Sequence, residues 1–342
     1  MNKSKFLAEV LHKSGGTRGL DLLWGANRLT VLGYHRIIDW HAPDFRDYEP
    51  VVSASPELFE REMAYVGENF NVIDLDALQA YLFENKSLPE RPMLITFDDG
   101  YLDNYQNAFP VLKKYGFPAV IFLVTSRMEN PTRLWWDECG YCFRFTEKTS
   151  AMLPLIGEQE LSTPEERKRA REQLMRQLKL IPEEAKQEAM QQMREALDIE
   201  SDSECLFMSW DQVRELVANG VSCQPHTINH PIMTRISLEE QKRQLAESRA
   251  RLRDETGLKA DAFAFPNGSP ADYSAETLQA LRDTGYTTAF TLSPGPIPSE
   301  EARRYPLQIR RVYLGHKDTF EIFAVKVMGL EAILERTPYL QG

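Results

Sequence analysis

The chain has little of several features that would place it outside the ordinary globular class. Only four of its 342 residues are cysteine, too few for a disulfide scaffold, so we expect a reducing compartment. The formal net charge is −11, which argues against a nucleic-acid surface, because phosphate binding needs clustered lysine and arginine. The length suits one large α/β domain or two smaller ones.

Long apolar runs are also missing. No stretch approaches the ~18 apolar residues of a membrane-spanning helix, and Glu9 and His12 interrupt the N-terminal segment. We therefore expect neither a signal peptide nor a transmembrane segment, and a cytoplasmic location. Residues 1–27 are predicted to form a helical leader that either packs on the main domain or contacts a membrane surface peripherally. Its apolar face and lysine rim consist of Phe6, Leu7, Val10 and Leu11 with Lys3, Lys5 and Lys13.

What the chain does contain is an alternation of apolar strands and amphipathic helices. RLTVLGYHRI (28–37), RPMLITFDD (91–99) and FPAVIFLVT (117–125) are predicted strands, and Ser55 and Pro56 begin a helix that runs to residue 70. Strands that are apolar throughout indicate a parallel sheet covered on both faces. Seven or eight such β–α units without an obvious switch point favour a barrel over an open sheet.

The alternation stops in the middle of the chain. Residues 127–205 begin with an aromatic segment and continue as a charge-dense run that favours helix, which predicts a mostly helical insertion, a lid over a site. The barrel is therefore expected to be discontinuous, over 28–126 and 206–325, and residues 326–342 are expected to form a C-terminal helix or tail.

The insertion contains the sequence CGYC (139–142). A thioredoxin-like pair would open a helix after a strand, and a four-cysteine zinc site would need a matching second pair, whereas Cys205 and Cys223 are widely spaced. We expect buried packing instead, with Cys223 behind the strand that precedes His226.

Two groups of polar residues follow predicted strands. Asp98 and Asp99 stand side by side at the end of an apolar strand, and Gly100 lets the chain turn so that both carboxylates approach one point. His226 and His230 are four residues apart in HTINHP, which over one helical turn places both imidazoles on one side. In α/β barrels the residues just past the strand ends converge on one face. One carboxylate and two imidazoles form a metal set with open positions, and the second carboxylate is free to act as a base.

TFDDGYLDN, HTINHP and FAFPNG, in this order, resemble the polysaccharide deacetylases of carbohydrate esterase family 4, the NodB homology domain. The resemblance implies a distorted (β/α)7 barrel that acts on N-acetylated, sometimes O-acetylated, sugars. It also implies that Asp98 is the general base and that Asn267 and Tyr101 contact the substrate or its oxyanion. The implied metal ligands are Asp99, His226 and His230.

The general acid has two candidates. LGH (314–316) matches a motif in which many family members carry the acid, which would make it His316. VLGYHRI, however, resembles the N-terminal strand of the poly-N-acetylglucosamine deacetylases, in which His35 would be the acid. We favour His35, because it lies at the end of an apolar strand; a core histidine satisfied by the backbone is the alternative.

Two positions depart from the family pattern. Ala264 stands where many members have an arginine that pairs with the base, so we expect Arg311, or otherwise Arg310, to replace it, since strand alternation lets only one of them face inward. The tryptophan segment behind the acetyl group is not evident either. The wall of the acetyl pocket is left open among Leu292, Leu314, Trp135 and Trp136.

The resulting hypothesis is a metal-dependent hydrolase that removes N-acetyl groups from a polysaccharide or glycan precursor. Zinc is the expected ion, although two imidazoles and a carboxylate also accept Fe, Co, Ni or Mn. The alternatives are an O-acetyl esterase with the same site and a catalytically silent glycan-binding barrel. The free carboxylate beside the ligands argues against a silent binder, which has no need for it.

Overall fold

The computed structural model describes residues 27–43, 45–130, 132–200 and 204–329. Its centre is a sheet in which parallel strands follow the order β10-β11-β13-β1-β5-β6-β9. These strands are β1 (Arg28–Tyr34), β5 (Pro92–Phe97), β6 (Ala119–Leu123), β9 (Val221–Pro225), β10 (Ala262–Ala264), β11 (Thr288–Pro294) and β13 (Ile309–Tyr313). Two short strands lie beside this path: β4 (Asn71–Val72) pairs with β5, and β12 (Ile297–Pro298) pairs antiparallel with β1.

The two end strands of this order come close to closing a barrel. The side chain of Gln224 on β9 accepts a hydrogen bond from the backbone N–H of Ala262 on β10 (3.1 Å). Nδ1 of His226 lies 2.7 Å from the carbonyl oxygen of Ala264. Side chains therefore bridge the junction at which a backbone ladder would complete the barrel. The predicted α/β fold, a distorted (β/α)7 barrel, is confirmed.

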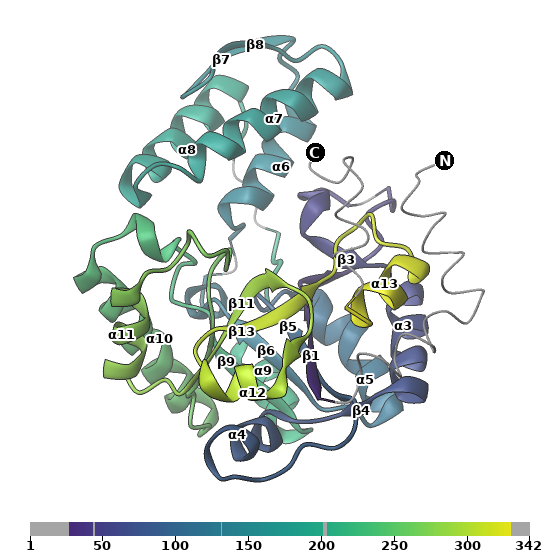
Figure 1. The fold of residues 1–342 in the computed structure, drawn as a ribbon. Helices are drawn as coiled ribbons and strands as arrows, with labels where there is room; N and C mark the ends of the chain where they lie inside the picture. The colour runs from purple at the N-terminus through teal and green to yellow at the C-terminus, as the bar shows by residue number, and fades with distance from the viewer. Residues whose placement is uncertain (1–26, 44, 131, 201–203, 330–342) are drawn as a thin grey trace.

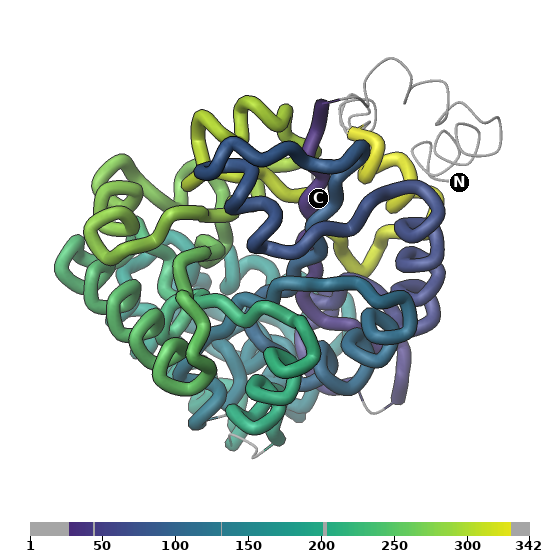
Figure 2. The backbone as a smooth tube through the Cα atoms, turned by 90° about the horizontal axis from the view of Figure 1, so that it is seen from below, coloured from purple at the N-terminus to yellow at the C-terminus, as the bar shows by residue number. Residues whose placement is uncertain are grey.

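Helices surround this sheet because its strands are apolar on both faces. Every residue of β5 and β6 is buried, which requires cover on either side. In Figure 1, α10 and α11 lie at one side of the sheet and α3, α5 and α13 at the other, and Figure 2 shows the same segments on opposite sides of the strands from below. The helices are α3 (Pro56–Asn69), α4 (Leu75–Phe83), α5 (Phe109–Tyr115), α9 (Trp210–Ala218), α10 (Leu238–Thr256), α11 (Ala275–Asp283), α12 (Ser299–Arg304) and α13 (Phe320–Val327).

Side-chain caps determine where several of these helices begin. Ser55 accepts a hydrogen bond from the N–H of Leu58, with Pro56 in the first turn of α3. Ser209 and Gln212 form a reciprocal capping box on α9. These caps satisfy backbone donors that the first helical turn leaves without partners, so the helix start predicted at Ser55 is confirmed.

The inserted segment lies beyond one end of the barrel (Figure 1). It contains α6 (Trp135–Phe145), α7 (Pro164–Leu178) and α8 (Glu183–Leu197), with an antiparallel ribbon of β7 (Ser150–Leu153) and β8 (Gly157–Glu160). The ribbon was not predicted, because its strands are short and, of their residues, only Ala151 and Leu153 are buried. The helices bury a shared apolar core of Ala170, Leu174, Leu178, Met190, Met193 and Leu197.

Shorter elements complete the described chain. A small parallel pair joins β2 (Arg36–Ile37) to β3 (Val52–Ala54). The short helical turns are η1 (Glu49–Val51), η2 (Asn104–Ala108, a π-helical turn), η3 (Thr125–Met128) and η4 (Met233–Arg235). Within the described ranges, no helix combines the length and apolar character needed to cross a bilayer. The predicted leader and most of the predicted C-terminal tail lie outside the described residues.

Candidate metal-dependent active site

The Asp98–Asp99 pair lies in a tight turn directly after β5. The N–H of Asp98 still donates to the carbonyl oxygen of Tyr34 on β1 (2.9 Å). Asp99 and Gly100 then adopt left-handed backbone conformations, with φ of 73° and 83°. A Cβ on Gly100 would lie 2.7 Å from the side chain of Leu123, so this position requires glycine. Adjacent side chains in a regular strand point to opposite faces. The turn instead lets the carboxylates of Asp98 and Asp99 face the same region.

The two histidines follow β9 in an irregular loop. The prediction of a helical turn across HTINHP is wrong, because Thr227 and His230 have positive φ angles of 70° and 60°. Their loop is held by the Thr227 hydroxyl, which accepts from the N–H of His230 (2.9 Å). The side chain of Gln244 on α10 accepts from the backbone N–H groups of Ile228 (2.9 Å) and Asn229 (3.2 Å). The imidazoles nevertheless meet, with ring centroids 4.8 Å apart.

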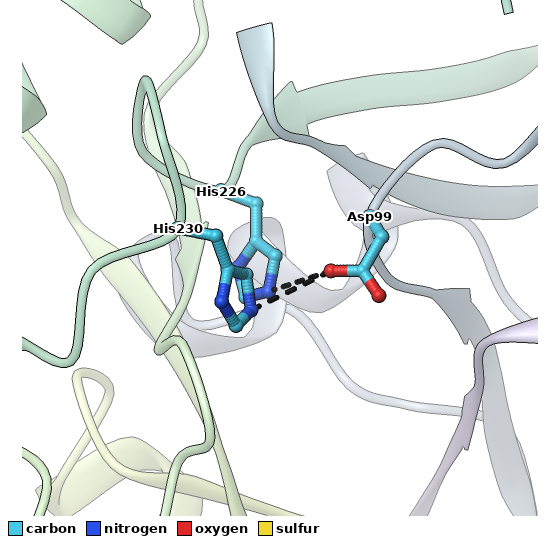
Figure 3. Close-up of side chains that lie close together, drawn as sticks. All are labelled: Asp99, His226 and His230. Carbon is cyan, nitrogen blue, oxygen red and sulfur yellow. Dashed lines mark ion pairs between the residues drawn. The ribbon is translucent and has the colours of Figure 1, made fainter. Parts of the chain in front are cut away.

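Asp99, His226 and His230 converge on one point (Figure 3). Oδ1 of Asp99 lies 3.6 Å from Nε2 of His226 and 3.5 Å from Nε2 of His230. Ligands held ~2.1 Å from a tetrahedral ion stand about 3.4 Å apart. The two distances from Asp99 therefore match the separation that a bound divalent ion requires, and all three donor atoms lie within 4.8 Å of one another.

The burial of Asp99 indicates that its carboxylate needs a cation as a partner. Both carboxylate oxygens are buried, and neither has a hydrogen-bond partner among the described residues. Burial, the Asp98 carboxylate and Asp137 raise the pKa of Asp99 well above its usual range. A buried charge needs a partner, and two imidazoles with a carboxylate form a set that zinc and other divalent ions accept. The residues present therefore fit a divalent ion.

Asp98 makes a different kind of contact, with Arg311 on β13. The guanidinium donates from Nη1 and Nη2 to the two carboxylate oxygens, both at 2.7 Å. Burial opposes the ionisation of Asp98, but Arg311 outweighs it and holds the pKa at about 2. Arg310 instead points to Glu301 at 3.3 Å. The structure thus brings Arg311, the favoured one of the two candidates, to the site, and only one of them faces inward, as the alternation along the strand predicts.

His35 lies beside this pair. Its Nε2 is 3.9 Å from Oδ2 of Asp98, and its ring packs edge-on against Tyr313 at 5.6 Å. Burial lowers the pKa of His35 to about 4, although the Asp98 carboxylate opposes this. His316 lies 5.4 Å from the ring of Trp40 and, unlike His35, is not among the described residues that line the cavity.

A cavity of about 500 Å³ opens over these groups. The barrel and the inserted segment both line it, so the insertion forms part of the site. The barrel contributes His35, Asp98, His226, His230, Asn267, Leu292 and Tyr313, and the insertion contributes Trp135, Trp136, Met175, Lys179 and Leu180. Of the four candidates for the acetyl pocket wall, Leu292 and the two tryptophans line the cavity, whereas Leu314 is buried in the core.

The side chain of Tyr101 does not reach the cavity. It is fully buried, and its hydroxyl donates to Asp137 (2.6 Å) while accepting from the indole N–H of Trp136 (2.8 Å). Asn267 does line the cavity, with a φ of 61°.

Sequence reasoning missed several residues that line the cavity. It missed Tyr313, although the position two residues after Arg311 shares its face of the strand. Met175 and Lys179 carry no sequence signal, because only the placement of the insertion brings them there.

Three of the four cysteines are buried away from this chemistry, and Cys205 is exposed. Cys139 and Cys142 are buried on α6, and the sulfur of Cys139 lies 3.6 Å from that of Met190. Burial raises the pKa of Cys142, and likewise that of Cys223 on β9, to about 12. A thiol that stays protonated is a poor nucleophile and metal ligand, in agreement with the packing role predicted for these residues.

Comparisons with known proteins point to the same chemistry. Residues 85–289 match the family model described as polysaccharide deacetylase. The chain is 24% identical over 289 residues to YxkH of Bacillus subtilis (strain 168), whose name places it among the polysaccharide deacetylases; this covers 84% of the chain and 72% of YxkH. It is 31% identical over 109 residues to the poly-beta-1,6-N-acetyl-D-glucosamine N-deacetylase of Escherichia coli (strain K12), covering 32% of the chain and only 16% of that protein.

A solved structure extends the comparison to the fold. The Streptococcus pyogenes deacetylase PplD, in complex with acetate, superposes with a TM-score of 0.60 at 18% identity. The match covers 88% of this chain and 99% of PplD. At this identity the likeness concerns the fold.

Proposed function

Because the chain belongs to the polysaccharide deacetylase family, we propose that it hydrolyses N-acetyl groups on the sugars of a polysaccharide or glycan precursor with the help of one divalent metal ion. The observation that carries this proposal is that two neighbouring carboxylates have different partners. Asp99 faces His226 and His230, whereas Asp98 is turned to Arg311 and lines the cavity. A site that only binds glycans has no use for the second group.

Asp99, His226 and His230 would hold the ion, with zinc expected and Fe, Co, Ni or Mn also compatible with this donor set. When bound, a divalent ion supplies polarisation of the acetyl carbonyl and lowers the pKa of a bound water toward ~7. The protein's own residues then have to place the sugar and move protons. The nearby cavity is large enough for a sugar ring, since ligand pockets start at roughly 300 Å³.

Asp98 is the proposed base. Arg311 keeps its carboxylate ionised, so it can accept the proton that the attacking water loses. A pKa of about 4 makes the imidazole of His35 neutral at pH 7. We therefore assign His35 the transfer of this proton from Asp98, 3.9 Å away, to the departing amine nitrogen. Breaking the amide bond requires this transfer, because an amide anion is a very poor leaving group.

The oxyanion that forms from the acetyl carbonyl needs donors besides the ion. We assign one contact to the backbone N–H of Asn267, in the loop after β10. Because the hydroxyl of Tyr101 is already bonded to Asp137, only the backbone N–H of Tyr101 is available for a substrate contact. Leu292 and Trp136, which line the same cavity, provide an apolar wall for the acetyl methyl group.

The test is the substitution Asp98→Asn. Acetate release from N-acetylglucosamine oligomers is expected to fall at least 100-fold, while binding of the metal remains, since Asp98 is not among the proposed ligands. Asp211→Asn, which changes a carboxylate that is 90% exposed on α9, is the control and should leave activity unchanged. Acetate release that survives Asp98→Asn would overturn the mechanism. Activity on O-acetylated sugars alone would favour the esterase alternative.

A further inference from the structure

We propose that Trp136, from the first helix of the insertion, positions the ligand His230 and makes the insertion a structural part of the metal site. This inference rests on the proposed function only in requiring that a divalent ion binds at Asp99, His226 and His230. It concerns a residue that the barrel itself does not supply.

The two histidines are held in different ways. His226 has its Nδ1 at 2.7 Å from the carbonyl oxygen of Ala264, a contact that fixes the ring and leaves Nε2 directed at Asp99. Ligand histidines almost always have such a partner on the second nitrogen. Nδ1 of His230 is buried and has no hydrogen-bond partner on another residue in the part of the chain that is described. Something else must therefore determine the orientation of the His230 ring.

The indole of Trp136 occupies the position to do so. Its ring packs edge-to-face against His230, with centroids 4.6 Å apart and planes at 71°. Both side chains are largely buried, at 7% and 6% exposed, so the indole limits how far the His230 ring can turn. An edge-to-face contact of this kind favours one orientation of the two ring planes.

Trp136 is itself anchored to the loop that carries the third ligand. Its indole N–H donates to the hydroxyl of Tyr101 at 2.8 Å, and Tyr101 stands two residues after Asp99. Tyr101 is fixed in turn by its hydrogen bond to Asp137 (2.6 Å) and by stacking on Phe207 (4.9 Å). The insertion thus contacts both loops that carry the proposed ligands through one residue, because Trp136 touches His230 in one loop and Tyr101 in the other.

The neighbouring Trp135 provides a matched control. It lies on the same helix, lines the same cavity and packs against Trp136 with centroids 5.5 Å apart. It also contacts the ammonium group of Lys186, which lies 5.3 Å from the ring centroid. Of the two indoles, Trp136 is the one with a ring contact to His230.

The experiment measures Co²⁺ binding to the purified full-length protein by visible absorption and by competition with a chelator. Trp136→Ala is expected to weaken Co²⁺ binding 10- to 100-fold, the usual effect of removing a group that orients a ligand, and to change the absorption band, since the freed His230 ring alters the ligand field. Trp136→Phe, which keeps an aromatic edge, should recover most of the affinity. Trp135→Ala should bind Co²⁺ within about threefold of wild type.

The outcomes separate this inference from the function on which it rests. Unchanged Co²⁺ affinity and an unchanged spectrum in Trp136→Ala would overturn the positioning role while leaving the metal site intact. A wild-type protein that binds no divalent ion would overturn both. If circular dichroism shows that Trp136→Ala does not fold, Trp136→Leu replaces it, because leucine fills more of the space than alanine but presents no aromatic edge. The same loss of Co²⁺ affinity is expected, and wild-type affinity would refute the role.

Discussion

Arg311→Met is the change that tests how the active site keeps Asp98 ionised. It removes a fully buried guanidinium that donates to both oxygens of Asp98, to the hydroxyl of Thr96 (3.2 Å) and to the carbonyl oxygen of Thr291 (3.1 Å). Methionine fills similar space but donates nothing. Asp98 is then left as a buried carboxylate without its cation.

The structure provides the size of the effect. Removing one partner of a buried ion pair costs about 3–5 kcal/mol. An aspartate has an ordinary pKa of about 3.9 in an unfolded chain, against about 2 for Asp98 in the folded protein. This depression stabilises the fold by about 2–3 kcal/mol at every pH above about 4, and the contribution is lost as the pH falls through 2. The penalty of Arg311→Met should therefore be full at pH 7 and shrink below pH 4.

The assay is urea unfolding of the metal-free protein at pH 7. It compares wild type, Asp98→Asn, Arg311→Met and the double variant that carries both substitutions. We expect the double variant to lose about 2–3 kcal/mol less than the sum of the single losses. Arg310→Met is the control: its ion pair with Glu301 is partly exposed, so it should cost no more than about 1 kcal/mol. Losses of Asp98→Asn and Arg311→Met that add within about 0.5 kcal/mol would refute the coupling.

Three further outcomes are expected. His35→Ala should lower kcat for acetate release at least 100-fold, whereas His316→Ala should stay within threefold; the reverse result would reassign the acid. Burial raises the pKa of Glu62 to about 8, and Glu62 accepts from the hydroxyl of Tyr34 (2.8 Å). The folded state thus keeps a proton on Glu62 that the unfolded chain loses above about pH 4.3. In urea unfolding, the free energy of unfolding of wild type should therefore fall by a few kcal/mol relative to that of Glu62→Gln between pH 5 and 8; parallel pH profiles of the two proteins would contradict this. Trp135→Ala should raise KM for an oligosaccharide severalfold with unchanged Co²⁺ affinity, and an unchanged KM would remove Trp135 from the sugar contacts.

The chemistry of the site was readable because it lies in short, contiguous motifs. Two carboxylates and a glycine after an apolar strand predict a turn that no uniform strand can make, and the structure has it, with Asp99 and Gly100 in left-handed conformations. Strand alternation predicted that only one of the two adjacent arginines faces inward, and the contact with Asp98 shows that it is Arg311. Apolar strands that alternate with capped helices predicted the barrel, since strand hydrophobicity and helix capping can both be read from short stretches of sequence.

Other features were beyond local reasoning. The loop from His226 to His230 is not helical, because Gln244, from a helix further along the chain, takes up its backbone donors. The choice between His35 and His316 depends on which loop reaches the cavity, and that depends on the packing of the whole barrel. No pattern in the sequence placed the ring of Trp136 against that of His230.

The sequence by itself determined the residue types of the candidate site, the two-carboxylate arrangement and the alternation of strands with helices, because each depends on neighbours within a few positions of the chain. Only the tertiary structure decided which of Arg310 and Arg311 contacts Asp98 and which histidine lies beside that carboxylate. It also decided that the inserted segment lines the cavity. Those outcomes depend on distances between residues far apart in the chain, which packing alone determines.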